Sequence, residues 1–183
     1  MEVELLHNLI EKPISGEWGT EGCLIKVIRT ANFTNQGVID FSNIVSRDIS
    51  SKKIKAKQLQ VSDIIIERSG GSPDQPVGRV VYFDKDEAFL CNNFTSILRP
   101  KKDLVFPKYL HYILFCKHKF GFVKKYQNNT TGIINLQLTR YILETKIPLP
   151  SMEMQKNTVK ILDAAFNLRE KEQEIVKKYD FLQ

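Results

Sequence analysis

The chain has 183 residues, which is enough for one domain with a hydrophobic core and an appendage. Its 42% hydrophobic and 26% charged residues are ordinary for a soluble globular protein. No apolar run approaches the roughly 20 residues of a membrane span, and the acidic start Met-Glu-Val-Glu is unlike a secretion signal. Cys23, Cys91 and Cys116 lack paired spacing, which fits reduced thiols better than disulfides or a zinc site. We therefore predict a cytoplasmic protein.

The net charge of +6 is unevenly distributed. Residues 151–183 hold six bases and six acids, so the excess of 21 bases over 15 acids lies in residues 1–150. A basic body with a neutral C-terminal segment predicts that the body meets a polyanion and that the segment meets protein.

The first third of the chain gives one clear strand. Residues 1–22 carry few signals, whereas residues 23–30 form a β-branched run typical of a strand. This strand leads Arg29 and Asn32 onto a loop, and residues 38–45 could be a further extended segment. Residues 50–59 carry four lysines, which fits either a solvated surface segment or a ridge that faces phosphates.

A strand, a turn-rich loop and a second strand follow. Residues 61–68 contain three successive isoleucines, which predicts a strand buried on both faces. The loop over residues 69–78 carries Gln75 and is flanked by Arg68 and Arg79. Glycines allow close backbone approach to a ligand, and arginines can form paired contacts with phosphate or guanine. The glycine spacing is not that of a nucleotide-binding P-loop.

The middle of the chain predicts a strand, a helix, a polar loop and a last strand. Residues 96–100 are extended, and Pro107 begins a helix that runs to about Lys119. The polar loop over residues 124–132 carries side chains that can read base edges and hold phosphates, namely Lys124, Lys125, Asn128 and Thr130. Residues 133–138 form the last predicted strand.

Two prolines then separate the body from a long helix. Pro148 and Pro150 can neither continue a helix nor sit inside a sheet, and Ser151 is a natural N-cap. No Gly or Pro follows up to Gln183. This predicts a body over residues 1–150 and a helix over residues 151–183, about 45 Å long.

Apolar residues recur along this helix at steps near 3.5, with Glu172 interrupting them. The stripe consists of Ile161, Leu162, Ala165, Phe166, Leu168, Ile175, Val176 and Tyr179. A helix that protrudes from a small body cannot bury this stripe alone, so we predict a partner helix from the same chain or from another copy. The alternative is that the helix folds back on its own domain.

We find no catalytic motif and no metal-binding cluster in the sequence. A magnesium-dependent endonuclease remains an alternative, with Asp74, Glu144 and Lys146 as its residues. Asp74 and Glu144 are about 70 residues apart, however, and Glu144 lies beside the proline joint. A helix-mediated assembly protein, whose body would bind protein, is the other alternative.

The ordered series of motifs resembles the target-recognition unit of specificity subunits from type I restriction–modification enzymes. The resemblance covers most of residues 14–170. It is carried by Asp63-Ile-Ile-Ile-Glu-Arg-Ser-Gly-Gly-Ser-Pro, Pro76-Val-Gly-Arg-Val, Asn93-Phe94, Pro107-Lys-Tyr-Leu, Thr131-Gly-Ile-Ile-Asn-Leu and Ile147-Pro-Leu-Pro. It implies a mixed α/β fold, with a mostly β core, flanking helices and a long coiled-coil-type C-terminal helix.

The resemblance also implies a non-catalytic DNA-recognition subunit. Such a subunit reads double-stranded DNA and docks methyltransferase subunits, while S-adenosylmethionine, ATP and magnesium belong to its partners. The family usually has two bodies and two helices, whereas this chain has one of each, so it is expected to be a half-subunit that pairs with a second copy or a truncated form. No membrane partner is expected. The predicted DNA contacts are Arg29, Asn32, Arg68, Gln75, Arg79, Lys124, Lys125, Asn128 and Thr130.

Overall fold

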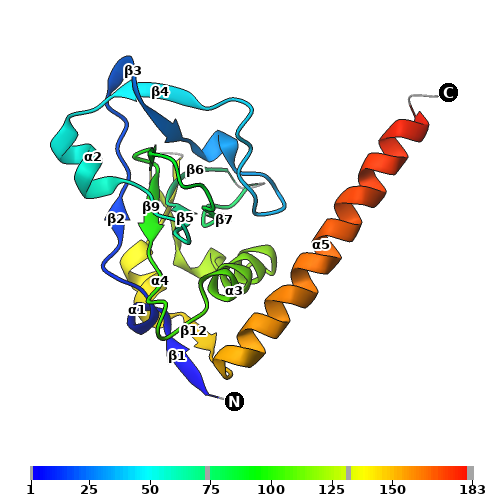
Figure 1. Ribbon diagram of the computed structural model, residues 1–183. Coiled ribbons are helices and arrows are strands. Elements are labelled where there is room, and N and C mark those ends of the chain that lie inside the picture. Colours follow the sequence, from blue (N-terminus) through cyan, green and yellow to red (C-terminus); the bar gives the residue numbers. More distant parts are fainter. Residues whose placement is uncertain (1, 73–74, 131–132, 181–183) are drawn as a thin grey trace.

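The computed structural model describes residues 2–72, 75–130 and 133–180. It consists of a mixed α/β body and a long helix, α5 (Met152–Asp180), that extends away from the body (Figure 1). The mixed fold with a mostly β core and a long C-terminal helix, as the sequence predicted, is confirmed.

The central sheet is antiparallel and has the strand order β2-β9-β5-β7. Its strands are β2 (Ile14–Ser15), β5 (Ile64–Glu67), β7 (Val80–Tyr82) and β9 (Thr95–Leu98). Ile64 and Ile66 belong to one hydrophobic cluster and Ile65 belongs to another, because successive strand residues face opposite sides of a sheet. The predicted burial of this strand on both faces is confirmed.

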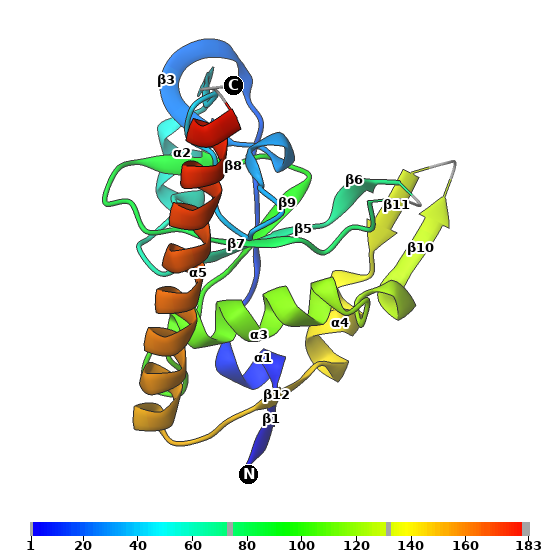
Figure 2. The same cartoon turned by 90° about the vertical axis from the view of Figure 1, so that its right-hand side faces the viewer.

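Helices cover one face of the central sheet. The helix α3 (Pro107–Lys119) packs against β7, and its Leu110 lies in the same cluster as Ile64. Pro107 stands at the start of this helix, as predicted. The short helices α1 (Leu6–Leu9) and α4 (Leu138–Glu144) lie against each other near the N-terminal end of the body (Figure 2).

A second sheet, of order β4-β3-β8, lies at the far end of the body from the joint with α5 (Figure 1). Here β3 (Thr20–Ile28) pairs antiparallel with β4 (Val45–Asp48) and parallel with β8 (Phe89–Cys91). The helix α2 (Ser51–Lys57) follows β4 and has no buried residue, so the lysine-rich segment lies on the surface. The 3-10 turn η1 (Thr30–Asn32) follows β3.

A third sheet, of order β10-β11-β6, was not predicted as a sheet. It consists of β6 (Ser69–Gly71), β10 (Gln127–Thr130) and β11 (Ile133–Leu136), with the 3-10 turn η2 (Lys124–Tyr126) before β10. Residues 69–78 and 124–132 were predicted as loops, and both predictions were wrong at these strands. The pairing of β11 with β6 and with β10 stabilises extended backbone that the local sequence does not favour.

The joint before α5 is held by the N-terminus. The strand β1 (Val3–Leu5) pairs with β12 (Lys146–Pro148), and the N–H of Leu149 donates to the carbonyl of Glu2 at 2.8 Å. Ser151 caps α5, since its Oγ accepts the N–H of Met154 at 3.3 Å. The predicted cap is therefore confirmed.

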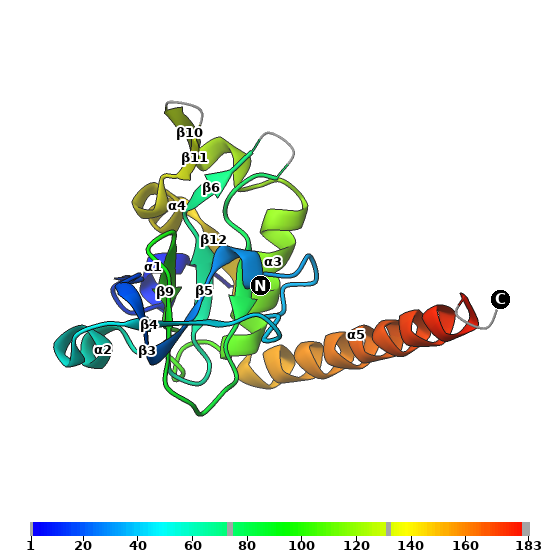
Figure 3. The ribbon, with the colours of Figure 1, turned by 90° about the horizontal axis from the view of Figure 1, so that it is seen from above.

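The first half of α5 packs on the body and the second half extends beyond it (Figure 3). Phe166 stacks on Tyr112 of α3 with ring centroids 5.6 Å apart. Asp163 accepts hydrogen bonds from Lys108, at 2.8 Å, and from Tyr112. Within the predicted stripe, Leu162 and Phe166 thus fold back on their own domain. The remaining members, Ile161, Ala165, Leu168, Ile175, Val176 and Tyr179, are exposed.

Candidate nucleic-acid interface

A row of polar side chains crosses the third sheet. Asn128 of β10 is the direct partner of Asn135 of β11, so their side chains share one face of the sheet. Asn135 in turn accepts a hydrogen bond from the hydroxyl of Ser69 in β6 at 2.6 Å. We call Asn128, Asn135 and Ser69 the polar row. Amides and hydroxyls of this kind can donate to and accept from the edges of bases.

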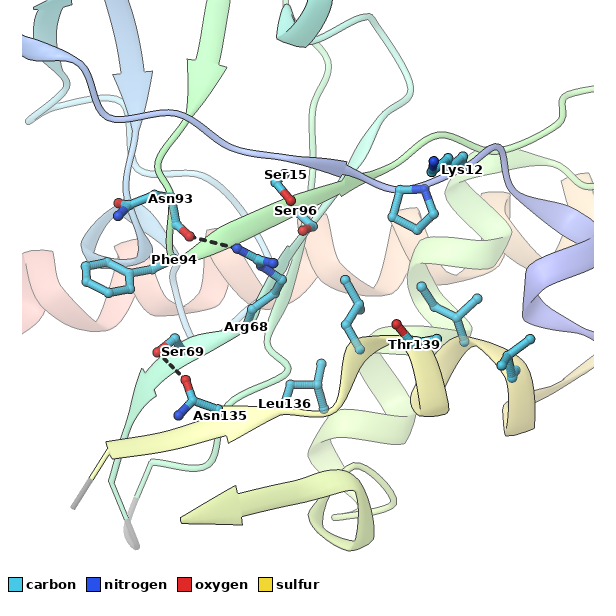
Figure 4. A pocket seen from close by; sticks show the side chains of 14 residues that line it. Lys12, Ser15, Arg68, Ser69, Asn93, Phe94, Ser96, Asn135, Leu136 and Thr139 are labelled. Atoms are coloured by element: carbon cyan, nitrogen blue, oxygen red, sulfur yellow. Dashed lines mark hydrogen bonds between the residues drawn. The ribbon is translucent and has the colours of Figure 1, made fainter. Parts of the chain in front are cut away.

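A groove of about 710 Å³ lies beside the polar row (Figure 4). Its polar lining includes Arg68, Ser69, Asn93 and Asn135, and Phe94 lines it with an exposed ring. The guanidinium of Arg68 donates from Nη2 to the carbonyl of Asn93 at 2.9 Å, which uses one of its five N–H groups. Arg68 Nε is buried and has no hydrogen-bond partner among the described residues.

Arg79 has a structural role that the sequence did not predict. It binds Glu67 through Nε and Nη2 at 2.9 and 2.8 Å, and it also donates to the carbonyls of Thr30 and Phe33. Only 13% of its side chain is exposed. The guanidinium is therefore already committed within the fold, which argues against the predicted DNA contact at Arg79.

Asn32 is likewise committed within the fold. Asn32 is 2% exposed. Its Nδ2 donates to the carbonyls of Asp40 and Asn43, and its Oδ1 accepts the N–H of Arg29. This burial argues against the predicted DNA contact at Asn32. Arg29 itself is half-buried and donates to the carbonyl of Asn43 at 2.9 Å.

Four other predicted contacts lie at the surface or border the third sheet. Lys124 and Lys125 are exposed on η2, Asn128 is exposed on β10, and Gln75 is exposed between β6 and β7. The backbone of Thr130 pairs with Ile133, but its side chain lies outside the described part of the chain.

The segment that carries Lys124, Lys125 and Asn128 is free of acids. Residues 104–143 contain no Asp or Glu, whereas they contain six basic residues: Lys108, Lys117, Lys119, Lys124, Lys125 and Arg140. Of these, Lys108 and Arg140 form ion pairs, with Asp163 and Glu144. The remaining lysines form no ion pair with any described residue. The segment that carries α3 and β10 is thus strongly electropositive at one end, which favours a polyanionic ligand.

Sequence reasoning missed Ser69, Asn93, Phe94 and Asn135 as interface residues. The signal for Asn135 was its place in a strand opposite a predicted site residue, which becomes visible once the register of the hairpin is known. Ser69 and Asn93 lie within motifs that carry the family resemblance. Their side chains have no charge, so nothing in the sequence selects them as DNA contacts.

The described part of the chain shows no assembly of the residues of the endonuclease alternative. Glu144 is paired with Arg140 at 2.9 Å, Lys146 lies on β12, and Asp74 falls outside the described residues. No group of three or more metal-ligating side chains gathers within residues 2–72, 75–130 and 133–180. The endonuclease alternative therefore finds no assembled site there. None of the described helices is long and apolar enough to cross a bilayer.

Comparison with known proteins gives a consistent family. Residues 22–178 match the family of the type I restriction modification DNA specificity domain. The chain is 31% identical over 125 residues, 66% of its length, to a putative type I restriction enzyme specificity subunit from Methanocaldococcus jannaschii. This match covers 28% of that relative.

Solved structures share the fold. A chain from a type I restriction–modification system, described for its complex assembly and conformational transition, is 12% identical with a TM-score of 0.66, over 94% of this chain and 44% of its own length. The specificity subunit of M. genitalium is 15% identical with a TM-score of 0.60, over 89% of this chain and 38% of its own. The specificity subunit of Thermoanaerobacter tengcongensis is 18% identical with a TM-score of 0.57, over 91% of this chain and 37% of its own length.

The chain spans less than half the length of each of these relatives. The likeness to these structures extends over 89–94% of this chain. On this match and these likenesses, the chain belongs to the family of type I restriction–modification DNA specificity domains.

Proposed function

We propose that this chain recognises one half of a bipartite sequence in double-stranded DNA and takes no part in the chemistry itself. The observation that carries the proposal is the polar row of Asn128, Asn135 and Ser69, beside a segment of 40 residues without an acid. The lysines would hold phosphates and the polar row would read bases, which separates affinity from sequence choice. S-adenosylmethionine, ATP and magnesium would act in partner subunits.

The test is DNA binding by the full chain at several salt concentrations. We expect Lys124→Ala combined with Lys125→Ala to weaken binding to every duplex and to lower the salt slope by about two, one for each phosphate contact. Lys52→Ala with Lys55→Ala is the matched control, since these exposed lysines of α2 carry the same charge at another surface. An equal effect of both pairs would refute this placement of the interface and favour the ridge on α2.

We further propose that the exposed face of α5 docks a partner helix. Met154, Ile161, Leu168 and Ile175 recur at intervals of seven residues and are 53–71% exposed. Ala165 and Tyr179 lie between them, with Glu172 interrupting this second row, so the two sets form a two-row seam of the kind found in coiled coils. The partner would be a methyltransferase subunit or a second copy of this chain.

Light scattering of the full chain and of a chain ending at Asn167 distinguishes these partners. The cut is placed there because Val159, Leu162 and Phe166 pack on the body, so an earlier cut would expose the core. A dimer that becomes a monomer on truncation supports a half-subunit, and two such bodies would read a palindromic target. A monomer in both cases contradicts self-association and directs the test to the methyltransferase subunit.

A further inference from the structure

The end of α3 forms a rigid turn that presents two phenylalanines. The N–H of Gly121 donates to the carbonyl of His118, and the N–H of Phe122 donates to that of Lys117, both at 2.9 Å. Gly121 has a φ of +75°, a left-handed value that glycine adopts without strain. This is a Schellman motif, which fixes the backbone at the end of a helix.

Both phenyl rings of this turn face solvent. Phe120 is 78% exposed and Phe122 is 59% exposed, whereas the next residue, Val123, is fully buried. In a Schellman motif the residue after the glycine usually makes an apolar contact with the last helical turn. Here the residue in that turn is Lys117, whose Nζ lies 5.5 Å from the centre of the Phe122 ring. The core therefore does not explain why these positions are aromatic.

Unneutralised positive charge surrounds the two rings. Lys117, Lys119, Lys124 and Lys125 flank them in sequence and form no ion pair with any described residue. Burial and, after it, the charge of Lys125 lower the pKa of Lys117. A protein partner with an apolar pocket would not need this charge, whereas nucleic acid offers both phosphates and stacked bases.

The turn is fixed to the candidate interface. His118 Nε2 lies 3.1 Å from the carbonyl of Pro76, and Gln127 donates to the carbonyl of Val77 at 2.9 Å. Val123 lies against Gly78, where an added Cβ would come within 3.3 Å of it. The turn thus borders the connection between β6 and β7 and leads through η2 into β10, as Figure 2 shows at the end of α3.

We propose, on the basis of the proposed DNA recognition, that Phe120 and Phe122 form an aromatic wedge that inserts against a base step of the bound duplex. The four lysines would hold the phosphates on either side of that step. Apolar wedges of this kind partly unstack a base step and bend the duplex, and aromatic rings gain free energy by stacking on bases of any sequence.

Binding and bending of one DNA test the wedge. The probe is a 30-bp duplex with a donor and an acceptor dye at its ends, titrated with the full chain at several salt concentrations. Phe120→Ala with Phe122→Ala is expected to weaken binding on the order of tenfold, to leave the salt slope unchanged and to abolish the change in energy transfer. Lys119→Ala is expected to lower the salt slope by about one.

Matched variants separate the effect of the wedge from the loss of any exposed apolar side chain and from a loss of stability. Val3→Ala, at an exposed apolar position of β1, should change neither binding nor bending. Phe120→Leu keeps an apolar side chain and should retain part of the bending. If the double variant lowers the melting temperature, the single Phe120→Ala decides, since that ring is the more exposed of the two.

The outcomes distinguish this inference from the proposed function. A wild-type chain that binds DNA, with a double variant that binds and bends it equally well, overturns the wedge and leaves DNA recognition standing. The turn would then be a docking surface for protein. A wild-type chain that does not bind DNA overturns both.

Discussion

Replacing Arg79 with alanine should destabilise the fold rather than weaken DNA binding specifically. The Arg79 and Glu67 side chains are 13% and 3% exposed, and the guanidinium also satisfies the carbonyls of Thr30 and Phe33. Removal of the arginine would leave the Glu67 carboxylate without its partner and the carbonyl of Phe33 without this donor, whereas the carbonyl of Thr30 keeps the N–H of Phe33. Such an uncompensated group is costly because water cannot reach it.

The size of the effect follows from the buried pair. Loss of one partner of a buried ion pair costs about 3–5 kcal/mol. For a domain of 150–250 residues, each kcal/mol lowers the melting temperature by about 2–4 °C, so Arg79→Ala should lower it by roughly 6–20 °C. Arg79→Met combined with Glu67→Leu should recover part of this loss, because no unpaired carboxylate remains, although the carbonyl of Phe33 still lacks its donor.

Thermal unfolding followed by circular dichroism measures the melting temperature, and the salt dependence of DNA binding shows whether a phosphate contact is lost. We expect a large drop in melting temperature and, below the transition, an unchanged salt slope. An unchanged melting temperature together with a salt slope lower by about one would refute the structural role and return Arg79 to the DNA contacts.

Three further predictions concern other parts of the chain. Gln155→Ala should lower the unfolding free energy by about 1–3 kcal/mol in urea, because the buried amide accepts the N–H of Phe106 and donates to the carbonyl of Pro150. Burial lowers the pKa of His111 to about 4 from 6.5, so the unfolded chain takes up a proton first as the pH falls. The unfolding free energy should therefore decrease by up to about 3 kcal/mol between pH 6.5 and pH 4, and urea titrations of His111→Leu should show a flatter dependence. Leu168→Glu should weaken any assembly through α5 without changing the melting temperature of the monomer, since Leu168 is 60% exposed; an unchanged assembly in light scattering would contradict the seam.

Features that depend on local sequence could be predicted well. The three isoleucines of β5, the proline that begins α3 and the serine that caps α5 each act on their own segment, and each prediction is confirmed. The resemblance to the family also rested on motif order, which does not require knowledge of contacts.

Features that depend on distant partners could not be predicted. β6 is extended because it pairs with β11, more than 60 residues further along the chain, and its Ser-Gly-Gly sequence favours a turn when read alone. An arginine that follows a loop looks the same in sequence whether it meets a phosphate or the carboxylate of Glu67. The difference lies in the register of β5 and β7, which places these two residues beside each other.

The pairing of β1 with β12 makes the first residues of the chain part of the base of α5. Three residue pairs between β1 and β12 and the hydrogen bond from Leu149 to Glu2 hold the segment that enters the helix, although the paired residues are more than 140 positions apart in sequence. Deletion of residues 1–5, or a bulky tag fused directly to them, would therefore hold α5 less firmly in its orientation relative to the body. An N-terminal change would then disturb assembly at the opposite end of the chain while the polar row stays intact.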